Sequence, residues 1–126
     1  MVLQFAAVGA GAAIGAWLRW GLSLWLNPKV PQFPLGTLAS NLVGGYLVGL
    51  AVAFFALRAD VSPEWRLFAI TGILGGLTTF STYSAEVTDL LMRGAYAAAL
   101  ALALTHLTGS IVLTIAGFAS YSLLTR

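Results

Sequence analysis

Residues 72–84 read GILGGLTTFSTYS and lie inside a hydrophobic segment long enough to cross a lipid bilayer. The stretch holds three glycines, five serine or threonine residues and two aromatic residues. Glycine destabilises a helix interior by about 1 kcal/mol relative to alanine, and serine and threonine side chains compete with the helical hydrogen bonds. We therefore expect the helix to break near 75–79. Irregular backbone at membrane depth is tolerated only where it is buried in protein or lines a polar cavity, so the break predicts an ion or substrate site.

The composition is that of a protein embedded in lipid. The chain has 126 residues, of which 60% are hydrophobic and 8% charged, and its mean hydropathy is +0.93. Soluble domains carry about 25% charged residues, so we predict an integral membrane protein. A net charge of +2 is too small and too scattered for a nucleic-acid surface. The chain has no cysteine and shows no nucleophile–base pair or metal-ligand cluster, so we do not expect an enzyme.

Four hydrophobic segments predict an all-α protein with four transmembrane helices, of which the third is broken. Each crossing takes about 20 residues, and the third segment is too long for one untilted crossing, so we interpret it as two half-helices. The N-terminus lacks a basic region and a convincing cleavage site, which indicates that the first segment is retained. The predicted helices span 3–26, 35–57, 63–93 and 95–124. Gly94 is expected to end the third helix.

Several polar residues lie within the apolar segments. Asn41 is about 9 Å into the second helix at 1.5 Å per residue, and its amide must find partners there. It either bonds a neighbouring helix or lines a pore, and Thr37 shares its face. The residues His106, Ser110 and Thr114 are spaced by four and share one face of the fourth helix, as an ion track or as interhelical hydrogen bonds. His106 has no second ligand-type residue nearby in the sequence for a metal site.

Two charged residues near helix ends carry further predictions. Arg19 lies among the tryptophans at the end of the first segment, where it either snorkels to the lipid headgroups or is buried and paired. In the buried case it would fix the fold or draw anions to a vestibule. Glu86 lies near the far end of the third segment and is expected at the membrane interface.

The basic residues divide almost evenly between the two sides of a four-helix topology. One side carries Arg58, Arg66 and Arg126, and the other carries Lys29 and Arg93, with Arg19 at a helix end assigned to neither side. The positive-inside rule therefore gives almost no preferred orientation. We hypothesise that the chain inserts in both orientations and forms antiparallel homodimers about a two-fold axis in the membrane plane.

Three stretches together resemble the bacterial Fluc (CrcB) fluoride channels: 72–84, GTLASN at 36–41 and GAWLR at 15–19. The resemblance extends over essentially the whole chain. It implies an antiparallel, dual-topology homodimer in the bacterial inner membrane, with two separate pores that let fluoride leave the cytoplasm passively. It also implies a structural sodium ion at the dimer centre, held by the backbone carbonyls of Gly75 and Thr78.

The same resemblance implies which residues face fluoride. Phe80 would be the pore aromatic with Tyr83 as its companion, and Asn41 would be the pore asparagine. The family has phenylalanine where this chain has Tyr83, whose hydroxyl could donate to fluoride or could anchor elsewhere and narrow the path. Arg19 and Glu86 would have vestibule or structural roles. The remaining pore positions carry hydroxyl or imidazole groups: Thr37, Ser81, Thr82, His106, Ser110 and Thr114.

Two other functions compete with this prediction. Small multidrug exporters also have four helices and dual topology, but they are expected to carry an acidic residue deep in the first helix. The first segment of this chain has none. A structural membrane subunit, whose polar residues only hold helices together, would show no ion flux.

Overall fold

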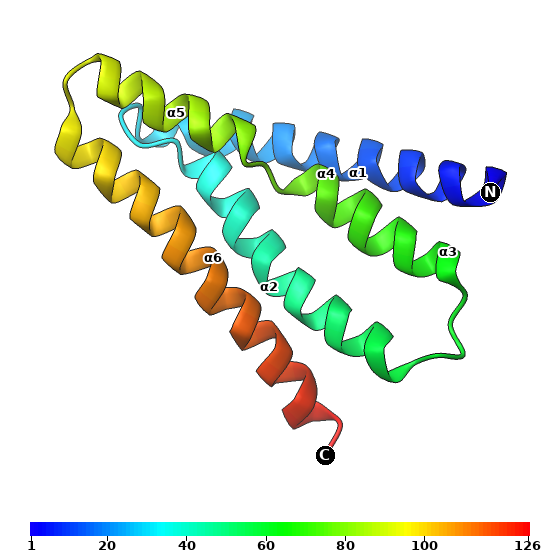
Figure 1. The fold of residues 1–126 in the computed structure, drawn as a ribbon. Coiled ribbons are helices and arrows are strands. Elements are labelled where there is room, and N and C mark those ends of the chain that lie inside the picture. The colour runs from blue at the N-terminus through cyan, green and yellow to red at the C-terminus, as the bar shows by residue number, and fades with distance from the viewer.

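The computed structural model describes all 126 residues as an all-α chain (Figure 1). Three helices, Val2–Lys29, Leu35–Leu57 and Tyr96–Leu124, are long and apolar enough to cross a membrane. The third predicted segment is divided into short pieces, and η2 within it is wound as a π-helix. The elements are α1 (Val2–Leu26), η1 (Asn27–Lys29), α2 (Leu35–Leu57), α3 (Pro63–Arg66), η2 (Leu67–Leu74), α4 (Gly75–Leu77), α5 (Ser81–Met92) and α6 (Tyr96–Leu124).

Glycines let two pairs of helices approach closely. Gly15 of α1 faces the backbone of η2 and α4, and Gly76 of α4 faces the backbone of α1 around Ala12. On the other side of the molecule, Gly49 of α2 packs on the backbone of α6 near Thr114. A Cβ at any of these glycines would collide with main-chain atoms that cannot move aside. In Figure 1, α2 accordingly lies between α6 and the pair formed by α1 and α4.

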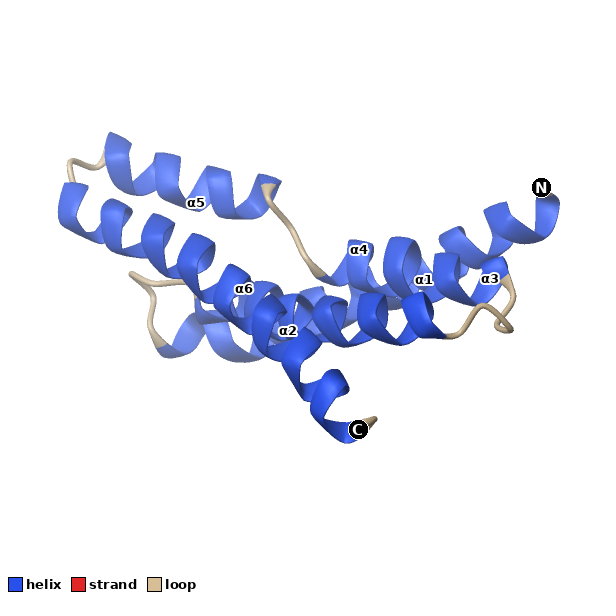
Figure 2. Cartoon of the chain, turned by 60° about the horizontal axis from the view of Figure 1, so that its bottom comes forward, coloured by secondary structure: helices blue, strands red, loops and turns tan.

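The third segment leaves the helical conformation at Thr78–Phe80. The sequence predicted a break near 75–79. The helix continues through Gly75 and Gly76, and the non-helical part begins at Thr78. Gly76 packs against α1, whereas Thr78 has extended backbone, with φ −85° and ψ 154°. Gly76 therefore serves packing, and the break itself is formed by threonine. Figure 2 shows that α5 is offset from the line of α3 and α4 by this extended linker.

The turn between α5 and α6 positions α5 against α6. Gly94 has φ +76°, the left-handed conformation that favours glycine. Its N–H donates to the carbonyl of Leu91 at 3.0 Å, and the N–H of Ala95 donates to the carbonyl of Leu90 at 2.9 Å. This pair of bonds is a Schellman motif. Leu90 also joins a buried apolar cluster with Ala99 and Leu102 beneath the turn, so this end of the α5–α6 pair is fixed by both packing and backbone geometry.

Candidate functional site

The break is held by the side chain of Asn41, which reaches it from α2. Its Oδ1 accepts from the backbone N–H of Thr79 at 2.8 Å, and its Nδ2 donates to the carbonyl of Thr79 at 2.9 Å. Nδ2 also lies 3.0 Å from Nδ1 of His106 on α6. Backbone groups released by a broken helix need partners when they are buried. Asn41 supplies partners for both backbone groups of Thr79 and connects α2, the break and α6.

A groove of about 800 Å³ opens beside this junction, between α2, the break and α6. Most of the residues predicted from the sequence to face fluoride line it. Its only ionisable side chains are Tyr83 and His106, and neither carries a permanent charge. The groove is lined by Asn41, Gly45, Val48, Gly75, Thr78, Thr79, Phe80, Tyr83, His106, Leu107, Ser110, Ile111 and Thr114.

The two aromatic residues of α5 have different environments. Phe80 is 76% exposed in the single chain, and its ring centroid lies 5.4 Å from that of Tyr83 in an edge-type arrangement. The Tyr83 ring also stacks at 4.5 Å on His106, and its hydroxyl donates to the carbonyl of Ala103 at 3.1 Å. The proton of this hydroxyl is therefore directed at the α6 backbone and not at the groove.

The hydroxyls on the α6 side of the groove also differ. Thr114 Oγ1 donates within its own helix to the carbonyl of Ser110 at 2.8 Å and across to the carbonyl of Gly45 at 3.0 Å. Its single proton is therefore shared between two backbone oxygens. The hydroxyl of Ser110 has no hydrogen bond with the protein, and Ser110 lines the groove, so its proton is free for a ligand.

Ser81, Thr82 and Thr37 do not line this groove. The hydroxyls of Ser81 and Thr82 lie 3.3 and 3.2 Å from Thr79 Oγ1, which also accepts from the backbone N–H of Thr82 and so caps α5. Thr37 is buried and its Oγ1 donates to Glu86 Oε1 at 2.5 Å. These three hydroxyls form hydrogen bonds within the protein, around the break and between α2 and α5.

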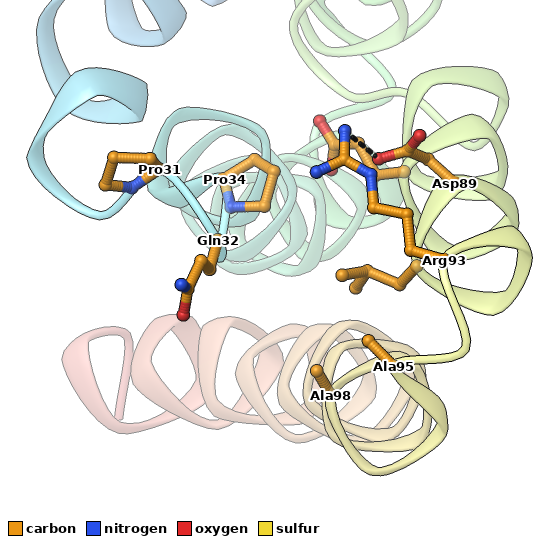
Figure 3. Close-up of a pocket in the computed structure, with 9 residues that line it drawn as sticks. Pro31, Gln32, Pro34, Asp89, Arg93, Ala95 and Ala98 are labelled. Atoms are coloured by element: carbon orange, nitrogen blue, oxygen red, sulfur yellow. Dashed lines mark ion pairs between the residues drawn. The ribbon is translucent and has the colours of Figure 1, made fainter.

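Glu86, which bonds Thr37, also lines a second pocket of about 380 Å³ at the α5–α6 turn. Figure 3 shows this pocket. Arg93 and Asp89 form an ion pair of 2.8 Å beside the pocket. Glu86 was expected at the membrane interface, and it is only partly exposed because one oxygen turns inward to Thr37. The pocket is lined by Pro31, Gln32, Pro34, Glu86, Asp89, Leu90, Arg93, Ala95 and Ala98.

Arg19 reaches from α1 to the break. Its Nε donates to the carbonyl of Gly76 at 3.1 Å. The last carbonyls of any helix lack intrahelical partners, and α4 ends at Leu77. Arg19 is thus paired with the break instead of only reaching toward lipid headgroups. The sequence contained a signal for this contact, since a helix that stops at membrane depth needs a donor for its terminal carbonyls.

The residues around the break suit a hard cation held by backbone oxygens. Gly75 and Thr78 both line the groove, and extended Thr78 turns its carbonyl away from the α4 axis. A Cβ on Gly75 would meet only the carbonyl of Ile70, at 3.6 Å, so this face of the chain is open. No group of three His, Cys, Asp or Glu residues could hold a metal. Two carbonyls are too few ligands for such an ion, so further oxygen ligands would be needed to complete the site.

The chain is similar to known proteins over most of its length. The family model described as CrcB-like protein, Camphor Resistance (CrcB) matches residues 6–118. A protein of Thiobacillus denitrificans named Fluoride-specific ion channel FluC is 59% identical over 120 residues, covering 95% of this chain and 97% of that protein. Proteins of the same name from Nitrosospira multiformis and Pseudomonas putida are 60% and 52% identical, covering 88% and 96% of this chain and 87% and 95% of their own lengths.

Proposed function

The chain belongs to the CrcB-like protein family, and from this membership we propose that it is a fluoride-specific ion channel rather than an enzyme. The observation that carries the proposal is the groove at the helix break. It combines an asparagine amide, an aromatic pair and a free serine hydroxyl, and it contains no permanent charge. A strongly charged site would hold an ion too tightly to release it, whereas several weak sites favour conduction.

The groove offers fluoride two kinds of contact. Fluoride is a small, strongly hydrated anion, so a pore must replace its water with hydrogen-bond donors. Ser110 supplies a free hydroxyl on the α6 side. An aromatic ring is electropositive at its edge, and Phe80 is exposed beside the groove, so its edge can also face an anion.

We place the working channel in an antiparallel homodimer. In the single chain Phe80 is exposed and the space beside Gly75 is open, as expected of surfaces that a second copy covers. Each copy would then contribute to two separate pores. A sodium ion between the copies would be held by the carbonyls of Gly75 and Thr78 from each, and it would satisfy backbone groups that lipid cannot. This ion has a structural role and is not transported.

Transport is passive in this proposal. Helix α1 has no acidic residue, so the chain lacks the proton-coupling group expected of a small multidrug exporter. Fluoride would leave the cytoplasm of a bacterium down its electrochemical gradient through the inner membrane. The direction of net flux is then set by the gradient and not by the protein.

Fluoride efflux from liposomes tests the proposal. Purified protein is reconstituted into vesicles loaded with potassium fluoride or potassium chloride, a potassium ionophore is added, and an electrode selective for the loaded halide records its external concentration. We expect rapid efflux of fluoride and no efflux from matched chloride-loaded vesicles. A rate equal to that of protein-free liposomes would support a structural subunit instead, and equal fluoride and chloride rates would exclude a fluoride-specific channel.

A further inference from the structure

An apolar groove of about 420 Å³ lies between α2, η2 and the end of α6. None of its lining residues lines the groove at the break. All nine lining residues are hydrophobic, and the only polar side-chain atom among them is the hydroxyl of Tyr121. A water molecule needs about two to four polar partners in such a space, so the lining favours an apolar occupant.

The apolar groove exists because glycine contacts hold the long elements in two pairs. Gly72 of η2 packs on the backbone of α1, whereas Gly49 of α2 packs on the backbone of α6. No glycine brings η2 against α2 in the range 47–55, and Figure 1 shows α2 and α3 diverging toward the loop that joins them. An empty groove would deprive its lining of dispersion contacts, so a bilayer component that fills it is favoured.

One end of the apolar groove carries a cation. Arg58 directly follows α2, and its guanidinium carbon lies 5.5 Å from the ring centroid of Phe54, which lines the groove. The Phe54 ring contacts the ring of Tyr121 edge to face, with 6.0 Å between the centroids. The membrane-capable span of α2 ends at Leu57. The charged end therefore lies at the depth of the lipid headgroups, and the apolar length lies within the hydrocarbon.

The charged end has hydrogen-bond donors to spare. A guanidinium carries five N–H groups, and Arg58 uses Nε and Nη2 to bond Asp60 at 2.9 Å each. The hydroxyl of Tyr121 has no hydrogen bond with the protein. The Arg58 and Asp60 side chains are 48% and 65% exposed, and exposed ion pairs contribute little free energy. Arg58 can therefore keep Asp60 and bind a phosphate with its remaining donors.

We propose that the apolar groove binds one phospholipid, with an acyl chain between α2 and η2 and the phosphate at Arg58. Apolar contact alone does not select this lipid, because the tails of the surrounding bilayer are as apolar as the groove. The phosphate contact therefore decides how tightly the lipid is held. The site uses no residue of the groove at the break, so it goes beyond the proposed function and does not depend on it.

Native mass spectrometry tests the phosphate contact. The full chain is delipidated in detergent and titrated with palmitoyl-oleoyl phosphatidylglycerol, and the lipids bound per chain are counted. We expect saturable binding of one lipid per chain. The diacylglycerol with the same two acyl chains lacks the phosphate and should bind at least about tenfold more weakly. Arg58→Gln should weaken binding of the phospholipid by a similar factor, which is what one hydrogen bond to a charged group corresponds to.

Two control variants match the two parts of the site. Lys29 also lies over an aromatic ring at a helix end, 5.6 Å from the Trp25 centroid, but neither residue lines the apolar groove. Lys29→Gln should therefore leave the affinity unchanged. Ala51 lines the groove, so Ala51→Phe should fill it and abolish binding. Ala56→Phe, on the exposed surface of α2, should not.

Several results would overturn the proposal. The absence of saturable binding, or equal binding of the phospholipid and the diacylglycerol, would refute the phosphate site without any variant. Binding that survives Ala51→Phe would place the lipid elsewhere. If Ala51→Phe instead converts dimers to monomers and leaves lipid binding unchanged, the groove is a contact between copies of the chain. The proposed function fails separately, if the unmodified chain conducts no fluoride in liposomes.

Discussion

Asn41 of α2 bonds both backbone polar groups of Thr79, which lies 38 residues away in the sequence. A single side chain thereby replaces the helical partners that the break removes from Thr79. The same amide contacts His106 on α6. The geometry of the break and the chemistry of the groove therefore depend on one residue, and this coupling leads to the first prediction.

Asn41→Leu should destabilise the protein and abolish fluoride flux. The substitution leaves the partly buried N–H and carbonyl of Thr79 unpaired, and because a fully buried unpaired group costs about 1–3 kcal/mol, we expect each of these to cost the lower part of that range. We expect the free energy of unfolding to fall by about 2–4 kcal/mol, measured by denaturant titration in detergent. Asn27→Ala is the matched control, because Asn27 Oδ1 bonds the N–H of Gly36 at 2.7 Å away from the groove. It should lose some stability and keep its flux.

Phe80→Ile should lower fluoride flux by about tenfold or more without loss of monomer stability. The ring is 76% exposed in the single chain, so its removal leaves little cavity, but an aliphatic side chain has no electropositive edge for an anion. Phe5→Ile is the control, since Phe5 is 74% exposed on α1 and does not line the groove. Unchanged liposome efflux from Phe80→Ile would remove the aromatic ring from the mechanism.

Tyr83→Phe should retain fluoride flux and lose a modest amount of stability. The Tyr83 hydroxyl donates to the carbonyl of Ala103 at 3.1 Å and not to the groove, so the variant loses one hydrogen bond, worth about 0.5–1.5 kcal/mol. Tyr46→Phe removes a similar bond, to Ser120 at 3.0 Å, and should behave alike. A large drop in flux for Tyr83→Phe alone would mean that its hydroxyl contacts the ion.

The adjacent glycines of α4 should respond oppositely to alanine. At Gly76 a Cβ would overlap the carbonyl of Ala12, which belongs to rigid backbone, so Gly76→Ala should cost about 1–3 kcal/mol through overpacking. At Gly75 the nearest atom would be the carbonyl of Ile70 at 3.6 Å, so Gly75→Ala should leave the fold of the single chain intact. Thermal unfolding of both variants checks the contrast, and equal losses would contradict it.

The nearly even distribution of basic residues should let the chain insert in both orientations. A tag fused after Arg126 should be accessible from both sides of the membrane in cells, as judged by protease protection. Adding three lysines to the loop 58–62 should bias the tag to one side, because basic loops are retained in the cytoplasm. A tag found on one side only in the unmodified chain would contradict dual topology and, with it, the antiparallel dimer.

The sequence by itself determined the helical segments and the region in which one of them is interrupted. Long apolar runs, the prolines that end them and the glycine and hydroxyl residues of 72–84 are local features, and local backbone preferences follow from them directly. The spacing of His106, Ser110 and Thr114 likewise placed these residues on one face, and all three line the groove.

Only the tertiary structure decided which hydrogen-bond donor pairs with which acceptor. Arg19 with the carbonyl of Gly76, Asn41 with Thr79, and Tyr83 with the carbonyl of Ala103 are contacts between different elements. They depend on how closely α1 approaches α4 through its glycines and on the rotation of α5 after the break. Periodicity within one helix contains no information on those distances. A side chain's partner across an interface is therefore fixed only when the helices pack.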